Sequence, residues 1–394
     1  MYETMIKLIK SAVLGKKDGT LKKPSEQELY KLFKLAHIHR MLHLVAQGYM
    51  INEFFGQNKT KIEETLSQSL MNAVVRHEQQ KYELIKIAEL FERLKVDFIF
   101  LKGAVLRDYY PQPWMRMSCD IDILVKPEAV ALCVEKLKLE YGYAEGRTGE
   151  YDISLTSPSG VHLELHYGLM EERFQASKTI DLIWDSAVPI KDGSHQLNLT
   201  DDVFYYYQLI HLAKHFESSG CGVRFFLDIW VMNHNNSFNK TEKSEEYLEA
   251  VGLSKFEKNV VHLSEVWFSS VEHTELSKRM QEYVLSSGIY GSTYNYMATL
   301  QIKAGGKNKY AASRIFLPYK KLVSKYPSLE CRKILMPFYQ IKRWIDVLCQ
   351  GRLRQSKDEL VLNSKITKVR VEFVGTLLRD LDFISDREFK GKKF

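Results

Sequence analysis

The chain has 394 residues, 45% of them hydrophobic and 27% charged, which is the composition of an ordinary soluble globular protein. This length allows two or three domains, each with its own core. The longest apolar runs fall far short of the roughly 20 residues that span a bilayer. Five cysteines without Cys-x-x-Cys spacing argue against a disulfide framework or a cysteine zinc site, so we expect a cytoplasmic protein.

Positive charge is concentrated in the last quarter of the chain. The net charge is +7, and residues 301–394 hold 22 Lys and Arg against 9 Asp and Glu. The first 300 residues hold 34 against 40. A basic segment of this kind favours contact with phosphates, including those of a nucleic acid, with an acidic partner or with an anionic membrane surface. The alternative is a solvated helical surface that is simply rich in lysine.

Apolar spacing along the chain changes from a helical period to a strand period and back. We expect helices over 1–95, strands over 97–101, 120–126, 152–156 and 161–166, and helices again after about 200. This order predicts an α/β (α+β) fold, in which a small mixed sheet with flanking helices lies between helical N- and C-terminal regions. The segment 367–382 alternates only partly, which leaves strand and helix both open.

The same pattern predicts four regions. They are an N-terminal helical region (1–95), a mixed core that carries the sheet (96–200), a further helical domain (201–300) and a basic, mostly helical C-terminal region (301–394).

Asp120 and Asp122 lie one residue apart in an apolar run. Side chains alternate across the two faces of a strand, so both carboxylates point to one side while Ile121 and Ile123 point into a core. Two neighbouring acids repel each other unless a positive ion lies between them, and Mg²⁺ is the usual ion. The alternative is an exposed strand face with two solvated acids.

The strand expected over 161–166 supplies a third acid. By the same alternation, His162, Glu164 and His166 share one face. If this strand pairs beside the aspartate strand, Glu164 lies within one strand spacing, about 4.8 Å, of the aspartates. Three carboxylates on one face can hold one or two Mg²⁺ ions, an arrangement suited to in-line phosphoryl displacement.

A phosphate-binding turn is predicted after the first strand. Lys102 and Gly103 lie where a strand ends and a helix begins, and free backbone N–H groups there favour an anion. Gly103 would let a phosphate approach the backbone closely, and Lys102 would add a positive charge. Arg116, four residues before Asp120, can bind a phosphate through its forked guanidinium.

The other candidates are mainly histidines. His211 and His215 are i,i+4 neighbours and share one helix face. A zinc site, the lining of a nucleotide or acceptor cleft, and hydrogen bonds within the helical region are all open for them. His166 is a candidate for a phosphate contact or a structural hydrogen bond. Arg224 and Asp228 are also i,i+4 neighbours, which favours a helix salt bridge.

These segments together resemble a known family, the uncharacterised nucleotidyltransferase family of bacteria. The resemblance covers about residues 85–235 and rests on the following segments: Phe100–Gly103, Tyr110–Pro113, Arg116, Asp120–Val125, His162–His166, His211–His215 and Arg224–Asp228. It implies membership of the DNA polymerase beta-type nucleotidyltransferase superfamily. The sequence departs from the superfamily pattern at Lys102-Gly103, where a Gly-Ser or Gly-Gly pair is typical, and in a longer gap from Gly103 to Asp120.

The resemblance implies an enzyme that moves a nucleoside monophosphate from a nucleoside triphosphate to a hydroxyl or phosphate acceptor, with Mg²⁺ as the expected ion and Mn²⁺ as the alternative. Its catalytic metal ligands would be Asp120, Asp122 and Glu164. Its nucleotide and phosphate ligands would be Lys102, Gly103, Arg116, His166, His211 and His215. Residues 96–200 would form the catalytic core, and residues 201–300 would close its cleft.

The acceptor stays open among a small molecule, a peptide, a protein and a tRNA. One alternative function is a non-catalytic nucleotide-binding or regulatory protein. Another is a nucleic-acid-binding protein that uses residues 301–394. A toxin-like enzyme that nucleotidylates tRNA or a protein is a further variant of the enzymatic hypothesis.

Overall fold

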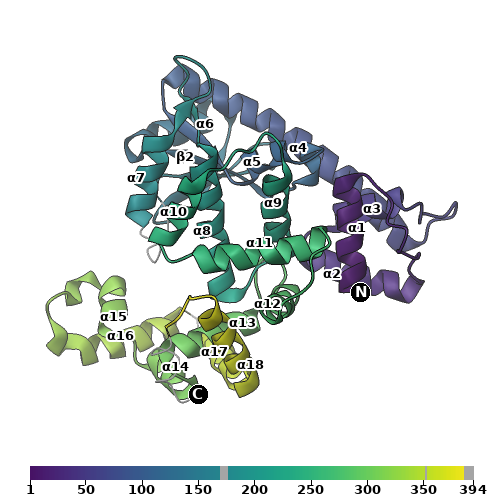
Figure 1. Cartoon of the computed structure of the whole chain (residues 1–394). Helices are drawn as coiled ribbons and strands as arrows, with labels where there is room; N and C mark the ends of the chain where they lie inside the picture. The colour runs from purple at the N-terminus through teal and green to yellow at the C-terminus, as the bar shows by residue number, and fades with distance from the viewer. Residues whose placement is uncertain (169–175, 351–352, 386–394) are drawn as a thin grey trace. The chain divides into compact units, whose positions relative to one another are not determined.

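A computed structural model describes residues 1–168, 176–350 and 353–385 (Figure 1). These residues form two compact units. The first comprises Met1–Lys214 and Gly222–Ser277, and the second comprises His215–Cys221 and Lys278–Phe394. The four regions predicted from the sequence divide the chain more finely and stay a prediction.

The first unit contains the sheet and the helices up to residue 268. Its helices are α1 (Tyr2–Leu14), α2 (Glu26–Ile38), α3 (Leu42–Ile51), α4 (Lys61–Leu94), α5 (Gly103–Leu106), α6 (Val130–Tyr141), α7 (Ala176–Ser186), α8 (Asp201–Ser219), α9 (Val223–His234), α10 (Glu242–Ala250) and α11 (Ser254–Phe268). The last turns of α8 belong to the second unit. The helices expected over residues 1–95 are confirmed.

The second unit is helical in its described residues. Its helices are α12 (Glu275–Leu285), which begins in the first unit, α13 (Thr293–Ala304), α14 (Lys307–Ile315), α15 (Tyr319–Lys325), α16 (Met336–Cys349), α17 (Leu353–Lys365) and α18 (Lys368–Asp380). The segment 367–382, left open between strand and helix, therefore forms a helix. None of the helices in the described part of the chain has both the length and the apolar character that crossing a membrane requires.

A mixed sheet of seven strands forms the centre of the first unit. The strands are β1 (Phe98–Leu101), β2 (Asp120–Val125), β3 (Ala144–Thr148), β4 (Asp152–Thr156), β5 (His162–His166), β6 (Val188–Pro189) and β7 (Gln196–Asn198). Their order in the sheet is β3-β4-β5-β2-β1-β7-β6. The neighbours β2 and β5 are parallel, as are β1 and β7, whereas the other pairs are antiparallel. The predicted mixed α/β fold is confirmed.

Alternation along β2 separates an apolar face of the sheet from the face that carries the acids. Ile121 and Ile123 are fully buried among residues of α4 and α6, as the sequence predicted. Leu124, on the same side as Asp122, packs instead against residues of α7 and α8. Apolar packing therefore lies on both sides of the sheet, and the two aspartates lie in the first half of β2.

Candidate active site

Two neighbouring parallel strands bring Asp122 and Glu164 together. Asp122 of β2 is the direct register partner of Glu164 in β5, and Asp120 is the partner of His162. Partners in adjacent strands lie about 4.8 Å apart and point to the same face. The strand pairing expected from the sequence is confirmed, and it lines up three carboxylates along one face.

Asp122 is also the centre of a network of charged groups. Its Oδ1 atom accepts hydrogen bonds from Lys102 Nζ at 2.7 Å and from His166 Nε2 at 2.8 Å. The same His166 nitrogen lies 3.5 Å from Glu164 Oε2. The carboxylate of Asp122 is only 4% exposed, so two positive partners compensate for its loss of hydration.

The electrostatics divide the three acids into two kinds. Burial and the carboxylates of Asp122 and Glu164 raise the pKa of Asp120 above its ordinary value. Burial would also raise the pKa of Asp122, but Lys102 and His166 outweigh it and lower that pKa. A hydrogen bond from His166 lowers the pKa of Glu164. Asp122 and Glu164 therefore hold full negative charge, whereas the charge on Asp120 is opposed by its neighbours.

The two basic groups show the complementary effect. Burial alone would lower the pKa of Lys102, but the negative charge of Asp122 outweighs it and raises that pKa. Burial also lowers the pKa of His166, and its hydrogen bonds to Asp122 and Glu164 reverse the effect and raise it. Both basic side chains thus lie against the acids, in the region where a metal ion would bind.

A metal ion has a suitable set of donors here. One ligand atom from each of Asp122, Glu164 and His166 lies within 4.8 Å of the others. Carboxylates suit Mg²⁺ and Mn²⁺, and an imidazole nitrogen suits Zn²⁺. Asp120, predicted from the sequence as a third ligand, is not part of this group.

The turn between β1 and α5 holds Lys102 in an uncommon backbone conformation, with φ 48° and ψ −120°. A non-glycine residue in this region costs about 1–3 kcal/mol and is typical of functional sites. Gly103 follows, and a Cβ added to it would meet the Cβ of Ser118 at 3.0 Å. Close packing against Ser118 therefore disfavours a side chain at this position. The phosphate contact predicted for Gly103 is untested.

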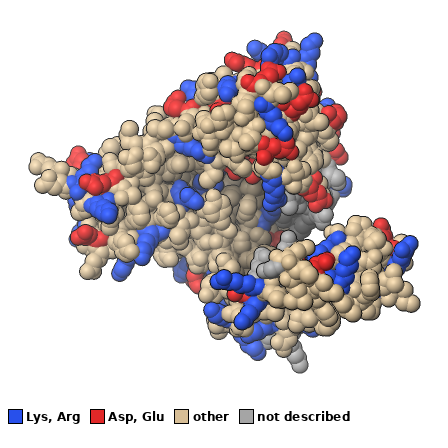
Figure 2. Space-filling view, turned by 180° about the vertical axis from the view of Figure 1, so that it is seen from behind, with Lys and Arg blue, Asp and Glu red and all other residues tan. Residues whose placement is uncertain are grey.

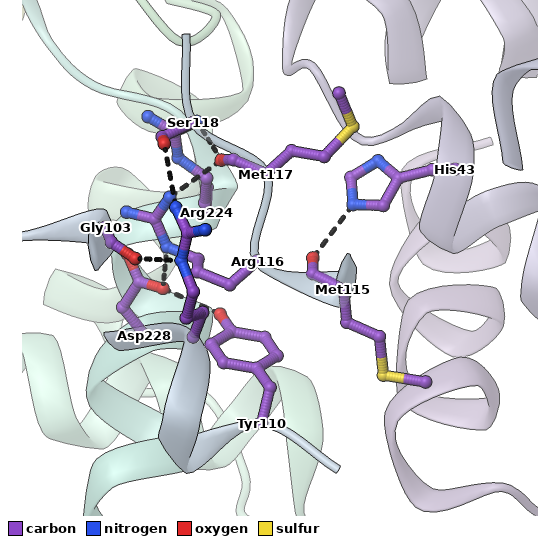
Figure 3. Close-up of polar contacts among 10 residues, drawn as sticks. His43, Gly103, Tyr110, Met115, Arg116, Met117, Ser118, Arg224 and Asp228 are labelled. Atoms are coloured by element: carbon purple, nitrogen blue, oxygen red, sulfur yellow. Dashed lines mark hydrogen bonds and ion pairs between the residues drawn. The ribbon is translucent and has the colours of Figure 1, made fainter. Parts of the chain in front are cut away.

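Arg116 lies in a second polar cluster, which Figure 3 shows. Its Nε donates to Oδ1 of Asp228 at 2.6 Å, and the Tyr110 hydroxyl donates to the same oxygen at 2.7 Å. Arg116 and Asp228 are both buried. The carboxylate of Asp228 thus binds Arg116, and Arg224 donates instead to the carbonyl of Met117 at 3.1 Å. These two contacts take the place of the helix salt bridge that was predicted between Arg224 and Asp228. A phosphate contact of Arg116 stays a prediction.

Sequence reasoning missed Arg107, which ties this cluster to the active-site turn. Its Nε donates to the carbonyl of Gly103 at 3.0 Å, and its NH2 donates to Oε1 of Gln80 on α4 at 3.0 Å. Gln80 in turn donates to the carbonyl of Ser118 at 3.1 Å. These contacts fix both chain segments that lead into the site. Because the partners are far apart in the sequence, no local pattern indicates them.

His43 of α3 supports the same segment from the other side (Figure 3). Its Nε2 donates to the carbonyl of Met115 at 2.8 Å, and burial, with the help of nearby Arg224 and Arg116, lowers its pKa to about 4. A neutral imidazole is therefore built into the folded state, whereas the unfolded chain takes up a proton near pH 6.5.

We expect His43 to make the protein acid-sensitive. The free energy of unfolding falls as the pH drops from about 6.5 toward 4, because only the unfolded chain protonates this histidine in that range. The total loss is about 3 kcal/mol. Urea unfolding of wild type and His43→Gln at several pH values in this window measures the loss, which should shrink in the variant. His37→Gln, on the exposed side of α2, is the control. An equal pH dependence in all three proteins would contradict the assignment.

The remaining predicted residues, His211 and His215, lie on α8 one turn apart. The ring of His211 lies 6.5 Å from that of Tyr207 and 5.8 Å from that of Phe225. His215 belongs to the part of α8 that is grouped with the second unit. The nucleotide-binding role of both histidines stays a prediction.

Comparison with known proteins supports a transferase. The profile of a family described as uncharacterised nucleotidyltransferase matches residues 25–269, which include the sheet, Lys102, all three acids and His166. No curated protein matches the chain. The matched residues make up more than half of the sequence, and the chain belongs to the uncharacterised nucleotidyltransferase family.

Proposed function

We propose that the protein transfers a nucleoside monophosphate from a nucleoside triphosphate to a hydroxyl or phosphate acceptor, with a divalent metal ion bound by Asp120, Asp122 and Glu164. Asp122 is the register partner of Glu164, and Asp120 lies two residues before Asp122 on the same face of the sheet. This arrangement is the observation that carries the proposal. Membership of a nucleotidyltransferase family supports it at the level of reaction class. Mg²⁺ is the expected ion, and Mn²⁺ is the alternative.

The bound metal would supply positive charge that stabilises the phosphoryl oxygens and lowers the pKa of the acceptor group. Lys102 balances the charge of Asp122 before substrate binds and can turn its ammonium toward the phosphoryl oxygens. Glu164 has a lowered pKa and is ionised, so it can accept the acceptor's proton. His166 orients both acids through hydrogen bonds.

Arg116 is better suited to a positioning role than to direct phosphate binding. Its guanidinium is buried, with Nε on Asp228 and NH1 on the carbonyl of Met117 at 2.8 Å. We propose that it fixes the segment that leads to Asp120. His211, His215 and Gly103 are kept as candidate nucleotide contacts.

Pyrophosphate release tests the proposed function. The full chain is incubated with ATP, CTP, GTP or UTP and Mg²⁺ or Mn²⁺, with and without a chelator. We expect release from at least one nucleotide and none with the chelator. Calorimetry could instead show nucleotide binding while no pyrophosphate is released with acceptors of any of the classes considered. That result would favour a non-catalytic nucleotide-binding protein.

Lys102→Met is expected to lower the turnover number by roughly 10²-fold, because a preorganised charge near the developing phosphoryl charge contributes on this order. Lys126→Met is the matched control, since Lys126 follows the other end of β2 and is exposed. Turnover by both variants at saturating nucleotide makes the comparison. Equal turnover by the Lys102 variant and wild type would remove Lys102 from the mechanism.

A further inference from the structure

Helix α16 of the second unit has an apolar face that is turned to solvent. Phe338, Ile341, Ile345 and Leu348 recur at intervals of three and four residues, which places them along one side of the helix. Each of these side chains is between 52% and 64% exposed. Gln340, on the other side, is buried and donates to the carbonyl of Leu317. The helix therefore packs through its more polar side and leaves the four-residue stripe uncovered.

Aromatic and apolar residues extend this surface beyond the stripe. Ile334, just before α16, is 89% exposed. Trp344 stacks edge-on against exposed Phe316, with ring centroids 5.5 Å apart, and its Nε1 donates to the carbonyl of Ile315 at 2.9 Å. The tryptophan is thus held in place beside the stripe. Contiguous exposed apolar surface of this kind marks an interaction site.

The segment that contains the stripe is rich in positive charge. Residues 319–350 contain seven Lys and Arg against two Asp and Glu. One of the two acids, Asp346, accepts a hydrogen bond from the Tyr326 hydroxyl. The basic side chains Lys320, Lys321, Lys333 and Lys342 are exposed. In Figure 2 the lobe at lower right, which carries α15 and α16, has mainly tan and blue surface with little red.

We propose that α16 is an interfacial helix that docks the protein onto an anionic lipid surface, with the stripe of Phe338, Ile341, Ile345 and Leu348 in the acyl boundary and the lysines at the head groups. A bilayer satisfies both features at once, since it takes up an apolar helix face and attracts the lysines around it. A second copy of the chain would bring two basic surfaces together. A nucleic acid would bind the lysines but leave the stripe in water.

The length of α16 fits a helix that lies in the membrane plane. Fourteen residues span roughly 21 Å, which is less than the roughly 30 Å thickness of the hydrocarbon core. The helix also carries Lys342, Arg343 and Asp346 within its length, which disfavours deep insertion. Docking would place the protein at the membrane without anchoring it permanently.

Vesicle co-sedimentation of the full chain tests the proposal. The vesicles contain phosphatidylglycerol and phosphatidylcholine in equal parts, or phosphatidylcholine alone. We expect binding to the anionic vesicles that weakens with added salt, and at least about tenfold weaker binding to the neutral ones. Ile341→Asp should weaken binding to anionic vesicles by at least about tenfold, since it places a charge in the apolar face.

The matched control is Val369→Asp, an exposed apolar residue of α18 in the same unit. It should bind like wild type, and circular dichroism should give both variants the same helix content. Absence of binding to anionic vesicles would overturn the proposal. An Ile341→Asp variant that binds anionic vesicles like wild type would also overturn it. So would a dimer, detected by light scattering, that this substitution dissociates while the protein does not bind vesicles.

Discussion

Replacing Asp120 with asparagine is expected to abolish nucleotidyl transfer and, at the same time, to stabilise the metal-free protein. The carboxylate of Asp120 is opposed by burial and by its neighbours Asp122 and Glu164, which raise its pKa. An amide of the same shape carries no charge and is free of this repulsion. Loss of one metal-binding carboxylate should lower turnover by about 10³-fold or more.

The stability gain has a defined pH dependence. Because the folded state raises the pKa of Asp120, its ionisation destabilises the fold only above the unfolded value, near 3.8. The stability advantage of Asp120→Asn should therefore be complete at neutral pH and should disappear near pH 3. Urea unfolding without metal measures it.

Mg²⁺ or Mn²⁺ should reverse the order of stability. A bound ion stabilises the wild type by an amount that grows with the logarithm of its concentration over the dissociation constant, and Asp120→Asn should lose most of this shift. Asp181→Asn, an exposed position on α7, should match wild type in stability, metal response and turnover. A variant that is destabilised without metal would contradict the repulsion at Asp120, and one that keeps its metal response would show that Asp120 is not a metal ligand.

The strand alternation was sufficient to predict the centre of this site. Residues 120–125 alternate acid and isoleucine, so the sequence alone indicated which side chains face the core and which share a polar face. The strands expected over 152–156 and 161–166 also form, and as β4 and β5 they pair antiparallel across the segment Ser157–Gly160. Both signals are local in the sequence.

Contacts between distant segments could not be predicted. Lys102 was expected to face a phosphate, yet its ammonium lies on Asp122, 20 positions away. Arg116 and Asp228 are separated by 112 positions, and only the packing of α9 near the segment before β2 brings them together. Strands β6 and β7 were missed because segments of two and three residues are too short to show a period.

The pair formed by Arg116 and Asp228 gives the largest expected effect on stability. Both side chains are buried, and Tyr110 donates to the same carboxylate oxygen. Removing one partner of a buried pair leaves an uncompensated charge, at a cost of about 3–5 kcal/mol. We expect Asp228→Asn to lower the free energy of unfolding by this amount.

Three arginine side chains, those of Arg107, Arg116 and Arg224, lie in this cluster. The carboxylate of Asp228 therefore balances more positive charge than that of a single partner. Burial and the nearby positive charge of Arg116 lower the pKa of both Arg107 and Arg224 to about 10, which shows that positive charge is in excess in this cluster. Without Asp228, the three arginines would repel one another with no buried acid between them. Tyr110→Phe removes only a neutral donor and should cost about 1 kcal/mol.

A double variant distinguishes the loss of the ion-pair attraction from the cost of leaving Arg116 buried without its partner. If the unpaired Arg116 causes the loss, then Arg116→Met together with Asp228→Asn should recover a large part of it, because buried ion pairs can be replaced by apolar groups at little cost. Glu140→Ala, which breaks the solvent-exposed pair with Arg93, should cost at most about 1 kcal/mol. Urea unfolding compares the four variants with wild type. If Asp228→Asn cost no more than Glu140→Ala, the buried pair would not hold the segment before β2, and Arg116 would again be available for the phosphate contact that the sequence predicts.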